Sequence, residues 1–341
     1  MPISLIGYTD KQIRVRLETL SGHLANYRKT SNPDGLRLIR VWARRSSVAM
    51  KLFESHYGNR EFKLLLDELK TVVHDLGAER DKLILKDLVE GSFSVLTDGE
   101  KEGAASLLQL KVISNELSDP IEAKRQLKRI LKIDLLKQFD SLAERADRKN
   151  EKKRADRSHC FFALPEADNA SELLEMAREV LREELDAVLK AAGCLDNPNK
   201  IAELHQLRIC VKKLRYTIDL MLPAIETVPD LHDSFAALHE KLRELQDSIG
   251  AIHDMDFVLH GLLDTLAKEA AQKCAAAIGF PKQKTAKYMS YDAGIGILKI
   301  AADIQLKRDS LFRQFCSAWK DNQTVSIFRL SANSLPKRSR K

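Results

Sequence analysis

The chain has few of the residues that break helices and few that favour short strands. Its 341 residues include 14 glycines and 9 prolines, too few turn formers for a sandwich or barrel built of many short strands. No stretch reaches the roughly 18 uninterrupted apolar residues of a membrane span, and the charged N-terminal region does not resemble a signal peptide. We therefore expect a helical, cytoplasmic protein with no membrane partner.

Cysteine and aromatic residues are also sparse. The five cysteines lie at least 16 residues apart without a Cys-x-x-Cys pair, which argues against a zinc finger and a redox dithiol. We interpret them as reduced core residues, and we expect no metal and no cofactor. Aromatic residues form 6% of the chain, which leaves little material for the stacking platforms that bind single-stranded nucleic acid.

The chain carries an excess of positive charge in its first half. It has 56 Lys and Arg against 49 Asp and Glu, a formal net charge of +7. Before Pro165 there are 31 basic and 24 acidic residues, and from there on 25 of each. The natural partner of such a chain is a polyanion or an acidic surface.

Apolar residues recur at helical spacing through most of the chain, which predicts an all-α protein. The length favours two domains. We expect two related antiparallel bundles of about four helices each, over residues 1–160 and 161–330, followed by a disordered basic tail over 331–341. Two of the helices are predicted to start at Asn32-Pro33 and Asn197-Pro198. The others are predicted at residues 10–28, 59–76, 79–97, 103–117, 120–149, 170–192, 230–249, 251–278 and 292–320.

Two segments 168 residues apart carry the same pattern of basic side chains. A second shared pattern, a glycine followed four residues later by an aspartate, comes after each of them, which indicates a duplicated unit. We interpret these glycine motifs as helix junctions whose aspartate starts the next helix or pairs with a basic neighbour. The basic residues are Arg37, Arg40, Arg44 and Arg45 in the first copy and His205, Arg208, Lys212, Lys213 and Arg215 in the second. The glycine motifs are Gly77 with Asp81 and Gly250 with Asp254.

In each copy the basic residues form a stripe on one helix face. On a helical projection His205, Arg208, Lys212 and Arg215 fall within roughly 80°. Lys51 returns to the same face of the first helix, where Ser47 stands in place of the last basic residue. A solvated face is the ordinary explanation for such a stripe, but exposed helices normally carry acids one turn away from their bases. From residue 206 to 216 there are four basic residues and no acid, so these faces are expected to bind an anion.

These motifs resemble the CHAD domain family, whose name refers to a conserved histidine in an α-helical domain. The family's repeat carries a His-x-x-Arg-x-x-x-basic-basic-x-Arg helix followed by a Leu-Gly-x-x-x-Asp element. The second copy matches fully, whereas the first has Arg37 in place of the histidine and Ser47 in place of the last arginine. The resemblance runs from about Lys11 to Lys320 and includes no fused triphosphate tunnel domain, because a Glu-x-Glu-x-Lys motif is missing.

The resemblance implies two bundles related by a pseudo-two-fold axis, with facing basic helices that bind inorganic polyphosphate, often on polyphosphate granules. Polyphosphate carries about one charge per phosphate and no bases, so its site needs Arg and Lys donors and no aromatic platform. The implied site uses both basic helices without catalysis. Its residues are Arg37, Arg40, Arg44, Arg45, Lys51, His205, Arg208, Lys212, Lys213 and Arg215.

Other interpretations remain open. Lys124, Arg125, Lys128 and Lys132 lie on one broad face of a predicted helix and either extend the anion track or are simply solvated. Nucleic acid is an alternative partner, although a recognisable reading helix is lacking. The His-Asp pairs at 74–75, 232–233 and 253–254 are compatible with a metal-dependent phosphohydrolase, but such pairs arise easily in a charged helical chain. His205 is either an anion donor or a packed histidine, and Arg37 at the matching position favours a donor.

Overall fold

The computed structural model describes residues 5–30, 33–57, 60–113, 134–158, 169–278 and 291–336, and within them all regular secondary structure is helical. The first half contains α1 Leu5–Thr30, α2 Pro33–Leu52, α3 Glu54–Tyr57, α4 Arg60–Glu90, η1 Phe93–Val95, α5 Asp98–Ile113 and α7 Leu135–Ser158. The second half contains α8 Asn169–Ala191, η2 Ala192–Asp196, α9 Ile201–Met221, η3 Leu222–Ala224, α10 Pro229–Ala277, α11 Tyr291–Lys320 and α12 Asn322–Ser334. The expected all-α class is therefore confirmed.

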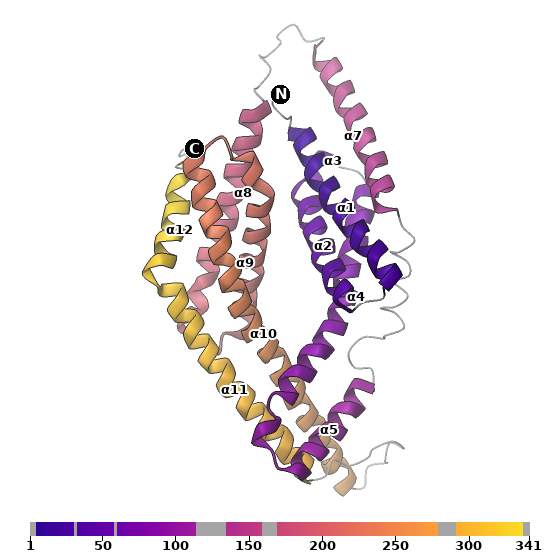
Figure 1. Ribbon diagram of the computed structural model, residues 1–341, viewed down its shortest axis with the longest axis vertical. Helices are drawn as coiled ribbons and strands as arrows, with labels where there is room; N and C mark the ends of the chain where they lie inside the picture. Colours follow the sequence, from indigo (N-terminus) through magenta and orange to yellow (C-terminus); the bar gives the residue numbers. More distant parts are fainter. Residues whose placement is uncertain are drawn as a thin grey trace.

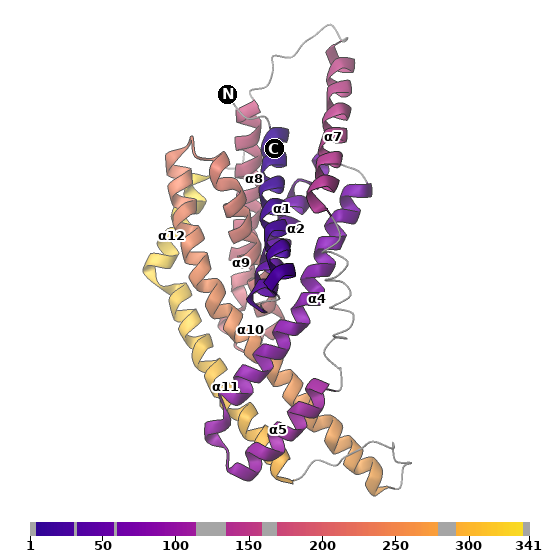
Figure 2. The same cartoon turned by 45° about the vertical axis from the view of Figure 1, so that its right-hand side comes forward.

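The helices of the two halves form two groups that meet along the middle of the molecule (Figure 1). On one side α1, α2, α4 and α7 pack together, and on the other α8, α9, α10 and α12 do so. The long helices α4 and α10 run on beyond these groups, and their ends gather with α5 and α11 at the far end (Figure 2). The pseudo-two-fold relation between the groups stays a prediction.

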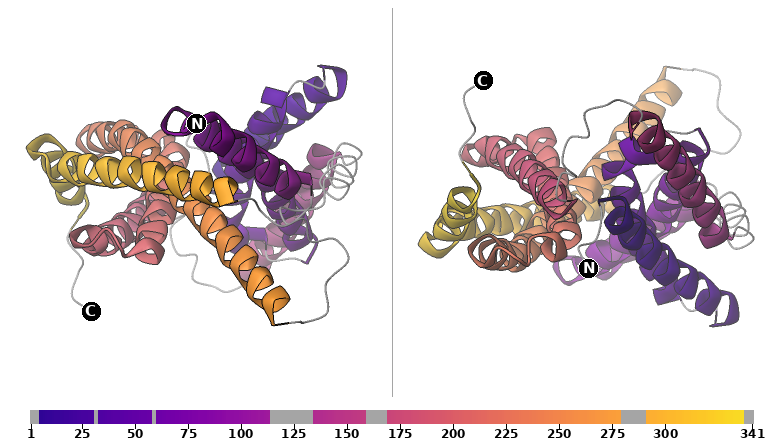
Figure 3. Two further views of the ribbon diagram at one scale, coloured as in Figure 1. Left: turned by 90° about the horizontal axis from the view of Figure 1, so that it is seen from below. Right: turned by 90° about the horizontal axis from the view of Figure 1, so that it is seen from above.

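The halves share buried apolar side chains. The larger hydrophobic core contains residues of both halves, and a smaller one joins the ends of α4 and α5 to α10 and α11. In the view from below, α5 lies beside α11 at this end (Figure 3). The Tyr8 hydroxyl of α1 donates a hydrogen bond to the Leu220 carbonyl of α9, and burial raises the pKa of Tyr8. Each fully buried Leu or Ile stabilises this arrangement by about 1.5–3 kcal/mol.

The structure corrects several local expectations. Gly77 and Gly250 lie inside α4 and α10 and end neither helix, so each pair of helices predicted around them is a single helix. The second basic helix begins at Ile201 and not at Pro198. The Asn197 side chain accepts a hydrogen bond from the Asn199 backbone N–H and does not cap the helix.

At the C-terminal end, α12 continues to Ser334 and Ser331 is buried, four residues into the stretch expected to be a tail. Residues 337–341 lie outside the described residues. The cysteines among the described residues are free, but Cys274 is exposed and is therefore not a core residue.

The crossing of α11 over α5 requires a residue without a side chain at Gly296. A Cβ atom there would lie 2.7 Å from the Glu100 carbonyl oxygen, whereas one at Gly250 would meet nothing within 4 Å. We expect Gly296→Ala to lower the free energy of unfolding by about 1–3 kcal/mol. Gly250→Ala is the matched control and is expected to raise it by about 0.5–1 kcal/mol, because alanine is the better residue inside a helix. Urea unfolding measures both, and equal effects of the two substitutions would contradict the packing described.

Candidate anion site

The two basic helices predicted from the sequence pack against each other between the two halves of the molecule. Helix α2 contacts α9, and α4 contacts α10 beside them. Each basic helix buries one face in the core: α9 does so through residues such as Leu207, Val211 and Leu214, and α2 through Ile39 and Ala43. The remaining faces carry the basic side chains. The core positions therefore determine which way the basic residues point.

Five basic side chains from three helices form one group, which we call the cationic cluster. Burial and the charges of Arg44, Arg80 and Arg208 together lower the pKa of Arg40 to about 10, while Asp81 opposes them. Burial also lowers the pKa of Arg208, an effect that Asp254 opposes and that the charges of Arg80 and Arg44 reinforce. The members of the cluster are Arg40 and Arg44 of α2, Arg80 of α4, and Arg208 and Lys212 of α9.

Lys212 is the member whose proton is held most weakly. Burial, followed by the charges of Arg208, Arg44, Arg80 and Arg40 in decreasing order, lowers its pKa to about 7. About half of the Lys212 side chains are therefore neutral near pH 7 in the empty site. A lysine in these surroundings regains its charge when an anion enters.

Two carboxylates lie against the cluster. Arg80 donates a hydrogen bond to Asp254 of α10 over 2.6 Å. The aspartate of the second glycine motif therefore pairs with a basic residue, which is one of the two roles predicted for it, and does not start a helix. Asp81 acts on both Arg40 and Arg208. Two carboxylates do not balance five bases, and the cluster keeps a net charge of about +3 when Lys212 is protonated.

Two histidines lie at the edge of the cluster. The ring centroids of His205 and His253 are 4.6 Å apart. Burial lowers the pKa of His205, and the neighbouring His253, Arg208 and Lys212 lower it further. His205 is thus neutral near pH 7, and its role as an anion donor stays a prediction.

One buried donor in the cluster has no hydrogen-bond partner among the described residues. Arg208 is only 8% exposed, and its Nε atom is buried without a hydrogen-bond partner. An unsatisfied buried donor costs about 1–3 kcal/mol, and more on a charged group. An anion that accepts from Arg208 removes that cost.

Six of the ten residues predicted for the site lie outside the cationic cluster. Lys51 and Lys213 are exposed and form ion pairs with Glu54 at 2.6 Å and with Glu184 at 2.5 Å. Arg37 is exposed on α2. His205 is the fourth and lies at the edge of the cluster, as described above.

Arg45 and Arg215 contact other residues and not the cationic cluster. The Arg45 guanidinium lies over the Trp42 ring at 4.7 Å and is close enough to Arg16 to lower the pKa of that group. Arg215 donates to Gln246 of α10 over 2.9 Å and covers Tyr216. These two side chains therefore already have neighbours of their own outside the cationic cluster, and the ten-residue binding site on the two basic helices stays a prediction.

Arg80 is the member that the sequence analysis missed. It directly precedes Asp81, just as His253 directly precedes Asp254, so a signal was present in the repeat. The glycine and the aspartate alone define the repeated motif, whereas the basic residue directly before each aspartate is the feature that points to Arg80.

The remaining candidates divide as follows. Lys124, Arg125, Lys128 and Lys132 lie outside the described residues. Among the described residues no group of three His, Cys, Asp or Glu side chains is arranged to hold a metal ion.

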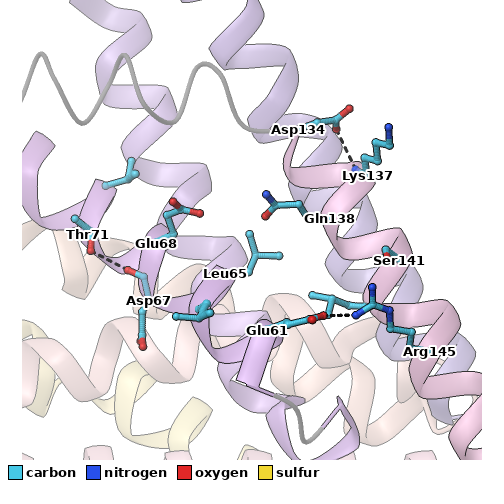
Figure 4. A pocket seen from close by; sticks show the side chains of 13 residues that line it. Glu61, Leu65, Asp67, Glu68, Thr71, Asp134, Lys137, Gln138, Ser141 and Arg145 are labelled. Atoms are coloured by element: carbon cyan, nitrogen blue, oxygen red, sulfur yellow. Dashed lines mark hydrogen bonds and ion pairs between the residues drawn. The ribbon is translucent and has the colours of Figure 1, made fainter.

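A groove of about 890 Å³ between α4 and α7 is a separate feature (Figure 4). Its polar lining includes Glu61, Asp67, Glu68 and Asp134, with Lys137 and Arg145 as its bases, and Glu61 is paired with Arg145. Four acids against two bases do not suit a polyanion, so the candidate anion site remains the cationic cluster.

Comparison with known proteins gives a consistent result. A CHAD domain profile matches residues 11–264, and no curated protein matches the chain. The structure of PptA from Streptomyces chartreusis is similar over 93% of this chain and 100% of its own, with a TM-score of 0.56 and 16% identity. The CHAD domain from the plant Ricinus communis is similar over 98% of this chain and 93% of its own, with a TM-score of 0.52 and 16% identity. At such identities the two structures show a shared fold. No helix of the described residues is long and apolar enough to span a membrane.

Proposed function

The chain belongs to the CHAD domain family, and from that premise together with the cationic cluster we propose that it binds inorganic polyphosphate. The observation that carries the proposal is the crowding of five bases from α2, α4 and α9 against only two carboxylates. Like charges in one partly buried place raise the free energy of the empty protein, and a chain of phosphates relieves that repulsion.

Polyphosphate suits the cluster better than nucleic acid does. Arginine forks donate paired hydrogen bonds to phosphate oxygens, and four of the five members are arginines. Single-stranded nucleic acid gains much of its affinity from bases stacked on aromatic rings. The aromatic residues of the basic helices are already engaged, since Trp42 stacks with His23 and underlies Arg45 while Tyr216 is buried under Arg215.

Binding without catalysis is part of the proposal, as is an association with polyphosphate granules in the cytoplasm. The metal-dependent phosphohydrolase is the competing class. Release of phosphate from polyphosphate by the full chain with added Mg²⁺ or Mn²⁺, measured over hours, separates the two, and sustained turnover would favour the hydrolase.

Calorimetric titration of the full chain with long-chain polyphosphate at physiological salt is the direct test. We expect saturable binding that weakens steeply with salt, because bound phosphates release counterions as nucleic acids do. RNA at equal phosphate concentration is the control and is expected to bind far more weakly. Equal binding of the two polymers would overturn the proposal in favour of a nonspecific polyanion-binding surface.

The affinity for polyphosphate is expected to fall as the pH rises above 7. In the empty site the pKa of Lys212 is about 7, and a bound polyanion raises it, so binding takes up a proton between these two values. The dissociation constant should increase by about 3- to 10-fold from pH 7 to pH 8.5. Lys212→Arg keeps its charge throughout and should show a flatter profile. An equal slope in the variant would mean that another group titrates.

A further inference from the structure

One carboxylate is bound to the cationic cluster across the boundary between the two halves of the molecule. Asp254 of α10 accepts a hydrogen bond of 2.6 Å from Arg80 of α4. The Asp254 side chain is 19% exposed, so water screens its charge only in part. It also acts on a second member of the cluster: burial lowers the pKa of Arg208, and Asp254 is the group that opposes this effect most strongly. The carboxylate therefore compensates bases of both α4 and α9.

The bond between Arg80 and Asp254 joins the two copies of the repeat. Arg80 and His253 directly precede the aspartates of the two glycine motifs, and the basic residue of the first motif holds the aspartate of the second. The Nδ1 atom of His253 lies 3.7 Å from Asp254, which is too far for a hydrogen bond. Asp254 is therefore held by the arginine from the other half and not by the histidine next to it.

We propose that Asp254 is a resident counter-anion that competes with the ligand anion for Arg80 and thereby limits the affinity of the cationic cluster. That the ligand is polyphosphate rests on the proposed function. In the empty protein the carboxylate takes the place on the guanidinium that a phosphate oxygen would take. A ligand that uses Arg80 must share it with Asp254 or displace it, and a phosphate placed at Arg208 meets the same negative charge.

This competition favours long polyanions over small ones. The carboxylate is carried by its own helix, so its effective concentration at Arg80 is high, and a small anion at low concentration displaces it poorly. A chain of phosphates competes better, because the other members of the cluster hold its remaining phosphates close to Arg80. Asp254 is thus a residue that determines specificity for ligands with many charges.

The other role open to a carboxylate beside an arginine is to orient the guanidinium for the ligand. A bidentate contact would fix the plane of the guanidinium. Here the hydrogen bond runs from Nη2 of Arg80 to Oδ2 of Asp254, and one bond between two side chains leaves that plane free to rotate. The two roles predict opposite results, because neutralising an orienting group weakens binding and neutralising a competitor strengthens it.

Calorimetric titration of the full-length Asp254→Asn variant with long-chain polyphosphate distinguishes the two roles. We expect the affinity at physiological salt to rise by about 3- to 10-fold, because one partly screened negative charge is removed beside the ligand. The slope of log affinity against log salt should steepen by about 0.7–0.9, as it does when a protein neutralises one more phosphate of a nucleic acid. Asp233→Asn is the matched control, since Asp233 of α10 is 82% exposed, and should bind as the wild type does. Unchanged or weaker binding by folded Asp254→Asn protein would overturn the proposal.

A double variant keeps the test decisive where the single substitution destabilises the protein. In Arg80→Gln the charge of Asp254 loses its partner and faces the ligand, so the affinity should fall by at least about tenfold. Arg80→Gln combined with Asp254→Asn leaves neither charge without its partner and should bind polyphosphate at least about threefold more tightly than Arg80→Gln does. Equal affinities of these two variants would mean that Asp254 acts solely by orienting Arg80, which contradicts competition.

Thermal unfolding with sodium sulfate tests the counter-anion without polyphosphate. The empty Asp254→Asn protein retains more uncompensated positive charge, so its thermal midpoint at low salt should lie a few degrees below that of the wild type. Added sulfate should raise this midpoint more than it raises that of the wild type or of Asp233→Asn, because sulfate replaces the lost carboxylate. Equal responses of the three proteins would overturn the counter-anion role. Absence of polyphosphate binding in all of them, with the sulfate difference present, would refute the proposed function and leave the counter-anion in place.

Discussion

Charge reversal at Arg44 and Arg208 together, R44E/R208E, is expected to weaken polyphosphate binding by at least about 100-fold. Each arginine supplies charge-assisted hydrogen bonds worth about 1.5–3 kcal/mol, and 2.8 kcal/mol is about a factor of 100 in affinity. Each new glutamate also repels the ligand. The salt dependence of any remaining binding should become shallower, because fewer phosphates are neutralised.

The double reversal should not unfold the protein. In the wild type Arg44 and Arg208 face Arg40, Arg80 and Lys212, and glutamates at these positions become partners of those three bases. Helicity by circular dichroism should be unchanged and the thermal midpoint should not fall. Lys63→Glu with Lys86→Glu changes the net charge equally on exposed parts of α4, and this control is expected to bind almost as the wild type does. Wild-type affinity in R44E/R208E would remove the cluster from the site.

The central part of the site was predictable because helical periodicity ties a basic face to an apolar one. Leu207, Val211 and Leu214 are all buried as expected, and they leave Arg208 and Lys212 facing α2. Arg40 and Arg44 reach the same place from α2 because Ile39 and Ala43 are buried. The direction of these side chains follows from local sequence alone.

The limits of the site were not predictable in this way. A helix face is wide, and which part of it meets a neighbour depends on where other helices cross it. Arg215 is one turn from Lys212 on the helical projection, yet it bonds to Gln246 of α10. Arg80 enters the cluster from α4, which packs against α2 and is not one of the two basic helices.

The uninterrupted helices α4 and α10 show the same limit. A glycine inside a helix costs about 1 kcal/mol relative to alanine. Local helix propensity therefore predicts that a helix ends at such a glycine. In α10 the neighbouring residues Ile249 and Ile252 are both fully buried. Burial of two such side chains contributes more than the glycine costs, so the helix continues and brings His253 and Asp254 to the site.

The position of Asp254 also depends on a buried arginine of α11. Arg308 is 2% exposed, and its guanidinium contacts Asp256 of α10 at 2.9 Å and donates to the Pro198 carbonyl before α9 over 2.7 Å. Asp256 is two residues from Asp254, and Pro198 lies three residues before the first residue of α9. Arg308 therefore joins the two helices that carry the second half of the site.

We expect Arg308→Met to lower the free energy of unfolding by about 3–5 kcal/mol, because Asp256 is left buried without its partner. Asp256→Asn alone should also destabilise, since it leaves the guanidinium with only its longer contact of 3.4 Å to Asp309 as an ion pair. The double variant should recover a large part of the loss, because methionine fills the space of the arginine stem and no unpaired charge remains. Urea unfolding of the three variants gives the coupling energy. Additive losses would show that Arg308 stabilises the fold through its packing on Phe312 and its bond to Pro198, and that the ion pair contributes little.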